Sequence, residues 1–237
     1  MVGYLHSENH CGMVDGQGIR SLFFLSGCPL RCLYCHNPDS WRLENGREVT
    51  AQELASEAAR YKNFHKNGGG VTISGGEPFS QPEFLEALVK ACKAHGMHTV
   101  IDTSGYATRE AAQKILQYVD VVLLDFKAFD AHVYRNLTGV EIDVLLAFLD
   151  LCHEMGVTVW IRYVLVPGIT DDEDMLMRLA SFLRQYDNIK KISVLPFHKN
   201  GEYKWKELGK KYKLYDTLPP TPQQVKVAQS ILAGGIA

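Results

Sequence analysis

Residues 27–36 read GCPLRCLYCH, and they place three of the chain's six cysteines, Cys28, Cys32 and Cys35, at C-x3-C-x2-C spacing. Thiolates this close in sequence can converge on one soft metal centre. A [4Fe–4S] cluster normally has four cysteine ligands, so three would leave one iron open to a substrate or cofactor. The spacing therefore predicts a metal centre with an open position. The alternative is a zinc knuckle in which His36 supplies the fourth ligand.

Length, composition and charge limit the class of protein around this motif. A chain of 237 residues, 46% hydrophobic and 22% charged, suits one soluble α/β domain with a sizeable core. The formal net charge of −2 gives no chain-wide basic field for nucleic acid. We find no signal peptide and no apolar run near the roughly 18 residues of a membrane span. We therefore expect a cytoplasmic protein without nucleic-acid or membrane partners, and unpaired clustered cysteines agree with a reducing compartment.

Short apolar runs alternate with amphipathic helical stretches along the chain. Strands are predicted at 21–26, 71–74, 99–101, 119–124, 157–166 and 192–195, with helical stretches between them. This alternation indicates βαβ units and a parallel sheet. Six units are too few for the eight of a closed barrel, so we expect an α/β fold, a partial (β/α)6 TIM-like barrel. A doubly wound open sheet is the alternative.

The predicted domain spans residues 1–237, with an N-terminal extension over 1–19 and a basic loop over 199–220 before the last helix. Three predicted helices begin with capping boxes, in which Thr50, Ser80 and Thr221 are each followed three residues later by Glu or Gln. Two other cysteines, Cys92 and Cys152, fall on apolar helix faces and are expected to be core thiols.

Polar residues follow the ends of several predicted strands. They are Glu77, Asp102, Thr103, Asp125, Lys127 and His198. Because active sites of parallel α/β folds form at the carboxyl ends of the strands, we expect these side chains to surround the cysteine loop. Arg162 lies inside a predicted strand and, if buried, requires an anionic partner.

The segment 199–213 interleaves six lysines with Tyr203, Trp205 and Tyr212. Basic residues between aromatic ones can bind nucleic acid. A solvated loop is the simpler expectation, and a docking patch for an acidic protein is the next alternative.

The cysteine triplet followed by Gly75-Gly76-Glu77-Pro78 resembles the radical S-adenosylmethionine (SAM) superfamily. Within it, the chain resembles activating enzymes of glycyl-radical enzymes in order along nearly its whole length, through 14–20, 27–37, 102–105, 124–127, 160–163, 166–168 and 195–198. Activases of several other glycyl-radical enzymes carry extra cysteines for auxiliary clusters between the cysteine triplet and the Gly-Gly-Glu motif. The corresponding residues 36–74 of this chain contain no cysteine. This favours the single-cluster family that acts on pyruvate formate-lyase. Gln17 departs from the proline usual in that family.

The resemblance implies a role for each matching residue. Cys28, Cys32 and Cys35 would ligate a [4Fe–4S] cluster whose fourth iron binds SAM. Asp15 would be catalytic, near the glycine loop of the partner. The SAM pocket would include Tyr34, Cys35, His36, Gly76, Glu77, Asp102, Thr103, Asp125, Phe126, Lys127, Arg162 and His198. Asp102, Thr103 and Asp125 would also bind a monovalent cation, Na⁺ or K⁺.

The resemblance implies an oxidoreductase that cleaves SAM reductively to a 5′-deoxyadenosyl radical, which removes a hydrogen atom from a glycine of pyruvate formate-lyase. Reduced flavodoxin or a similar carrier would donate the electron. Three alternatives stay open. The chain could activate another glycyl-radical enzyme, or act on a small molecule, which would be expected to bring an accessory domain or further cluster ligands. A non-catalytic iron–sulfur electron carrier is the third, and such a carrier has no need of an open iron.

Overall fold

The six predicted apolar segments form parallel strands in the computed structural model, which describes residues 1–234. The strands are β2 (Arg20–Leu25), β4 (Gly70–Gly75), β5 (His98–Thr103), β6 (Val121–Asp125), β7 (Thr158–Leu165) and β8 (Ile189–Pro196). Each pairs in parallel with the next one in this order. Their residues are mostly buried, as is usual where helices cover a parallel sheet. The prediction of a parallel α/β fold built from six such units is confirmed.

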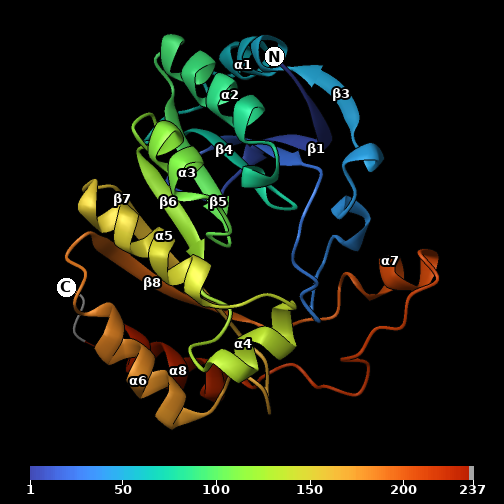
Figure 1. Ribbon diagram of the computed structural model, residues 1–237, viewed down its shortest axis with the longest axis vertical. Coiled ribbons are helices and arrows are strands. Elements are labelled where there is room, and N and C mark those ends of the chain that lie inside the picture. The colour runs from blue at the N-terminus through green and yellow to red at the C-terminus, as the bar shows by residue number, and fades with distance from the viewer. Residues whose placement is uncertain (235–237) are drawn as a thin grey trace.

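Two further strands were not predicted from the sequence, one in the N-terminal extension and one directly before the first helix. β1 (Val2–Gly12) pairs antiparallel with both β2 and β3 (Arg47–Thr50), so the sheet order is β3-β1-β2-β4-β5-β6-β7-β8. Only Gly3, Leu5 and Gly12 are buried along β1, and the other residues are exposed or half-buried. A strand with this little buried surface lacks the apolar run by which the others were found. In the described part of the chain the sheet is open, with β3 and β8 at its edges (Figure 1).

Helices cover the sheet, and most of them share one core with it. They are α1 (Ala51–Arg60), α2 (Pro82–Ala94), α3 (Arg109–Leu116), α4 (Ala131–Thr138), α5 (Asp143–Glu154), α6 (Glu173–Leu183), α7 (Glu202–Glu207) and α8 (Pro222–Ala233). Figure 1 shows α1 and α2 beside the N-terminal strands, and α6 and α8 beside β8. Cys92 and Cys152 are fully buried in this core, as predicted. No helix within residues 1–234 has the length and apolar content needed to cross a bilayer.

Two of the three predicted capping boxes are present, at Thr50 for α1 and at Thr221 for α8. The prediction for Ser80 was wrong, because Ser80 lies in a short 3-10 helix, η3 (Pro78–Ser80), and α2 begins two residues later at Pro82. The fixed φ of proline suits the first turn of a helix. Gln81 stands at the cap position, and its side chain instead bonds the backbone of Tyr4 and Ser26.

The basic segment after β8 is folded in part, so the expectation of a solvated loop was right for most of its lysines and wrong for its helix and two of its aromatic residues. It forms α7, and its Trp205 and Tyr212 pack against the cysteine loop, whereas Tyr203 is exposed. The second apolar cluster made there consists of Tyr34, Leu137, Val166, Phe197, Trp205, Tyr212 and Leu214. The Trp205 indole N–H donates to the Cys35 carbonyl at 2.8 Å, and Lys204 donates to the Asn37 side chain at 2.8 Å. Exposed lysines of the segment, such as Lys210, face outward. The segment therefore supports the cysteine loop.

Candidate active site

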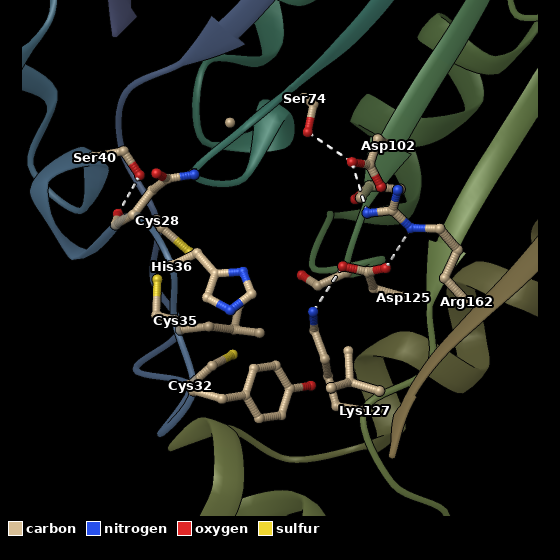
Figure 2. Close-up of a pocket in the computed structure, with 18 of the residues that line it drawn as sticks. Cys28, Cys32, Cys35, His36, Ser40, Ser74, Asp102, Asp125, Lys127 and Arg162 are labelled. Carbon is tan, nitrogen blue, oxygen red and sulfur yellow. Dashed lines mark hydrogen bonds and ion pairs between the residues drawn. The ribbon is translucent and has the colours of Figure 1, made fainter. Parts of the chain in front are cut away.

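A cavity of about 320 Å³ lies at the carboxyl ends of the parallel strands. It brings together most of the residues predicted from the sequence: Asp15, Cys28, Cys32, Tyr34, Cys35, His36, Gly76, Asp102, Thr103, Asp125, Lys127, Arg162 and His198. Figure 2 shows the cysteines on one side, with Asp102, Asp125 and Arg162 facing them across the cavity. The expected convergence of strand-end residues on the cysteine loop is confirmed.

Two predicted cofactor contacts, Glu77 and Phe126, are not among the residues that line the cavity. The Phe126 side chain is fully buried in the core. Both carboxylate oxygens of Glu77 accept protein hydrogen bonds, one from Thr103 Oγ1 at 2.6 Å and the other from the Ser104 N–H at 2.8 Å. Burial raises the pKa of Glu77, although the Ser104 and Thr103 hydroxyls favour its charged form. Glu77 therefore links the turn after β4 to the turn after β5. This structural role replaces the expected contact between its side chain and a cofactor.

The three thiols are free and line the same cavity. Within residues 1–234, no three His, Cys, Asp or Glu side chains are placed to hold one metal ion. A [4Fe–4S] cluster binds each thiolate through a different iron, so separated thiols suit a cluster better than a single zinc ion. Burial raises the pKa of Cys32 to about 11 and also raises the pKa values of Cys28 and Cys35. Metal binding must therefore displace their protons.

His36 is turned toward the C-terminal part of the site. Its Nε2–H donates to the His198 carbonyl at 3.1 Å, and the two imidazole rings stack with centroids 4.2 Å apart. This nitrogen is therefore engaged with the backbone after β8, and the contact holds the imidazole ring in one orientation beside the cysteine loop. The stacked rings form one flat wall of the cavity.

Arg162 of β7 organises the acidic side of the cavity. Its Nε, Nη1 and Nη2 atoms donate to Asp125, Asp15 and Asp102 at 2.9, 2.9 and 3.0 Å. The planar fork of a guanidinium suits three carboxylates in different directions, which a lysine cannot match. The anionic partners that a buried Arg162 requires are thus present. Because all three of its donor groups are occupied by aspartates, Arg162 positions the acidic side chains.

The acidic wall carries more negative than positive charge, since Arg162 and Lys127 face three aspartates. Burial and the charge of Asp125 outweigh Arg162 and raise the pKa of Asp102 to about 6. For Asp125, burial is outweighed by Lys127 and Arg162, which hold its pKa well below the usual range. Asp102 Oδ1 is buried without a hydrogen-bond partner in the described chain, and so is the hydroxyl of Tyr34. These two atoms are free to bind a ligand.

At Gly76 the backbone itself lines the cavity, because glycine has no side chain to cover it. A Cβ at this position would stand 2.3 Å from the Gly27 carbonyl oxygen and 3.2 Å from the Cys28 Cβ. The Gly76 N–H donates to the Leu25 carbonyl at 2.8 Å and locks the turn after β4 against β2. Only glycine fits here, beside the first cysteine, and an amino group of a ligand could reach the backbone at this point.

Asp15 stands on the loop between β1 and β2, which a buried arginine supports from within the sheet. The fully buried Arg20 donates from Nε to Thr72 Oγ1 at 2.6 Å, and that hydroxyl donates to the Asp15 carbonyl at 2.6 Å. Arg20 Nη1 also donates to the Gln17 carbonyl at 2.9 Å. Gly16 adopts φ +127°, a conformation that disfavours other residues. The loop is thus held at its base while its carboxylate faces Arg162.

We expect Thr72→Val to loosen the Asp15 loop. Valine keeps the shape of the buried side chain but removes both the acceptor of Arg20 and the donor to Asp15. An unmet buried donor costs about 1–3 kcal/mol, so amide exchange over residues 13–18 should rise about tenfold or more. Hydrogen exchange with mass spectrometry measures this. Thr99→Val is the matched control, because Thr99 is as buried and lies opposite Val71 on β5. Equal exchange of the loop in both variants would contradict the role of Thr72.

The geometry of the site and the comparisons with known proteins indicate the same class of protein. Residues 22–180 match the model of the Radical SAM superfamily. The chain is therefore a radical SAM protein, with the open iron of a three-cysteine cluster as the expected centre of its site. It is 42% identical over 235 residues to the pyruvate formate-lyase 1-activating enzyme of Escherichia coli K12, covering 98% of this chain and 96% of that one.

A second relative, the pyruvate formate-lyase-activating enzyme of Staphylococcus epidermidis, is 45% identical over 234 residues, covering 95% of this chain and 93% of its own. A solved domain of a pyruvate-formate lyase-activating enzyme from Bacteroides vulgatus superposes with a TM-score of 0.59 at 26% identity, covering 70% of this chain and 94% of that domain. The chain belongs to the family of pyruvate formate-lyase-activating enzymes.

Several residues of the cavity were missed by the sequence analysis. Those not singled out are Phe24, Leu30, Asn37, Ser40, Trp41, Ser74, Gly75, Ser104, Val164, Leu195 and Pro196. Asn37, Leu195 and Pro196 stood inside matching motifs, so the signal was present. Ser40 and Trp41 come from the turn after the cysteines, where neither periodicity nor strand position marks them.

Proposed function

We propose that the protein activates pyruvate formate-lyase by forming a glycyl radical on it. The observation that carries the proposal is the cavity itself, where the three free thiols face an acidic wall fixed by Arg162. The high similarity to two named activating enzymes over nearly the whole chain supports the choice of substrate. A cytoplasmic location and reduction by a flavodoxin-like carrier are part of the same proposal.

The residues present fit the cofactors that the superfamily implies. The thiols of Cys28, Cys32 and Cys35 would hold a [4Fe–4S] cluster, and the unpartnered Asp102 Oδ1 and Tyr34 hydroxyl offer contacts to a polar ligand. When bound, the cluster and SAM supply one-electron cleavage of the SAM sulfonium and a 5′-deoxyadenosyl radical. The protein's share is to bind, orient and exclude water around that chemistry.

The chain's own charges suit a cationic ligand. SAM carries a sulfonium and an ammonium group, and the cavity presents an excess of carboxylate on one wall. Lys127 pairs with Asp125 at 2.7 Å and lies 5.7 Å from the centre of the Tyr34 ring, so it stiffens the wall beside the cysteines. The stacked His36 and His198 offer a flat surface for the adenine ring.

A monovalent cation is the second proposed occupant of the acidic wall. Asp102 Oδ1 is a free buried acceptor, and Asp125 lies beside it through their shared partner Arg162. The Thr103 hydroxyl is already engaged, since it donates to Glu77 and accepts from the Gly105 N–H. Thr103 would therefore contribute its backbone carbonyl.

Asp15 is proposed to meet the glycine loop of the lyase. Its loop is exposed at Met13 and Val14, which are 73% and 86% accessible, while its carboxylate reaches into the cavity to Arg162. The open sheet leaves room for a polypeptide to approach the strand ends. An exposed apolar rim beside a buried charge suits a protein substrate better than a small molecule.

The test is anaerobic reconstitution with iron, sulfide, SAM, a strong reductant and pyruvate formate-lyase, followed by electron paramagnetic resonance. We expect a glycyl-radical signal on the lyase together with release of methionine and 5′-deoxyadenosine. SAM cleavage without that signal would refute the proposed substrate while keeping the chemistry. A signal on another glycyl-radical enzyme alone would reassign the partner. A K⁺ or Na⁺ requirement for SAM binding would support the proposed cation.

A further inference from the structure

A second hollow lies directly behind the cysteine loop. It is a groove of about 780 Å³ with largely apolar walls, among them Pro29, Trp41, Leu43, Phe79 and Val144. Only Cys28 and Trp41 also line the active-site cavity. These two residues therefore form the wall between the groove and the place where the cluster would be bound.

The wall is flanked by positive charge. The Arg31 guanidinium lies 4.7 Å from the centre of the Trp41 ring, and Lys210 Nζ lies 5.7 Å from it. Both side chains are exposed, as is Arg42, whose side chain is 76% accessible. Among the residues that line the groove the acid is Glu44, 3.9 Å from Arg42, so near Trp41 one carboxylate stands beside three basic side chains. An acidic surface would complement this rim.

The proposed reaction requires one electron from outside the protein for each activation. Electron transfer between buried centres weakens steeply with distance, so the carrier must approach the cluster closely. The cavity side is reserved for SAM and the glycine of the lyase. The groove reaches the other side of Cys28 without crossing that space, and its apolar floor next to exposed Leu43 resembles a docking surface.

We propose that this groove and its basic rim are the docking site of an acidic one-electron carrier protein, whose reduced flavin or iron–sulfur group faces Cys28 and Trp41. The proposal rests on the proposed function. One electron leaves the reduced carrier and enters the oxidised cluster held by the three cysteines. The carrier is oxidised by one electron and the cluster is reduced by one, and no bond forms or breaks. The carrier and the lyase occupy different faces and can bind together.

The test compares reduction of the cluster-loaded enzyme by two reductants, a reduced flavodoxin as protein probe and dithionite as small probe. Leu43→Glu and Lys210→Glu place negative charge in the groove and at its rim. Lys190→Glu is the control for Lys210→Glu, since it makes the same charge change at an exposed position at the start of β8. Stopped-flow absorbance follows cluster reduction, and calorimetry measures flavodoxin binding to the same loaded protein.

We expect the ratio of the flavodoxin rate to the dithionite rate to fall about tenfold or more in both groove variants, with weaker flavodoxin binding, and to stay within about twofold of wild type in the control. Damage to the cluster would slow both reductants and cancel in the ratio. An unchanged ratio and unchanged binding in both variants would overturn the proposal. Loss of lyase binding instead of flavodoxin binding would also overturn it. Failure of wild type to form a glycyl radical with dithionite would refute the proposed function alone.

Discussion

Cys32→Ala is expected to abolish cluster binding, SAM cleavage and glycyl-radical formation together. The cavity supplies three thiols, and the remaining cysteines of the chain cannot replace one of them. Cys92 and Cys152 are fully buried in the helix–sheet core, and Cys11 lies on the exposed part of β1. Because the proposed radical chemistry depends on the cluster, activity should fall by at least ~10³-fold.

The measurements for Cys32→Ala are iron and sulfide content, the visible absorbance of the cluster, and 5′-deoxyadenosine release. Cys11→Ala is the matched control, since it removes an exposed thiol outside the cavity and should keep wild-type iron content. Circular dichroism shows whether the fold survives without the cluster. SAM cleavage at wild-type rates by Cys32→Ala would contradict the cluster assignment.

Arg162→Met is expected to be the most destabilising single change in the cavity. It leaves Asp15, Asp102 and Asp125 facing one another with Lys127 as their cation. Removing one partner of a buried charge network costs about 3–5 kcal/mol, because the other charges stay desolvated. Urea denaturation of the cluster-free protein measures the loss of unfolding free energy, and SAM binding should fall with it because the acidic wall loses its order.

The loss in Arg162→Met should depend on pH in a defined direction. Burial already raises the pKa of Asp102 above its usual value, and the loss of Arg162 raises it further, so the folded variant binds more protons at Asp102 than the unfolded one. Its stability relative to wild type is then highest at acidic pH and falls as pH rises toward neutrality. Arg162→Lys should recover part of the stability through its charge, but not the three-way geometry. A loss in Arg162→Met no larger than that of exposed Arg42→Met would refute this role.

The central parallel strands could be predicted because β2, β4, β5 and β6 are buried along nearly their whole length. Val71 to Ser74 and Val119 to Leu124 stand out as apolar runs bounded by polar turns, and their structure follows the prediction. β1 could not be found this way, because an antiparallel strand near the edge presents polar residues such as Ser7 and Glu8 to solvent. Its pairing with β3 depends on partners distant in sequence, which no local pattern shows.

The candidate site was also predicted only in part. Strand-end position predicted which polar residues would meet, since topology alone brings the carboxyl ends together. It did not predict what each side chain does there. Glu77, like Asp102, lies near the carboxyl end of a strand. Its carboxylate oxygens accept hydrogen bonds from Thr103 and Ser104, however, and its side chain does not line the cavity. The sequence predicted that a buried Arg162 needs an anionic partner. It did not predict that three aspartates from different parts of the chain would all bind it.

The contact between Trp205 and the Cys35 carbonyl has a consequence for the order in which the surroundings of the cysteines are completed. The three cysteines directly follow β2, whereas the apolar residues that pack against their loop include Phe197, Trp205, Tyr212 and Leu214, which follow β8. A folding intermediate that contains only the first strands therefore leaves the three thiols uncovered on this side. We expect stable cluster binding only once residues 197–214 have packed against the loop.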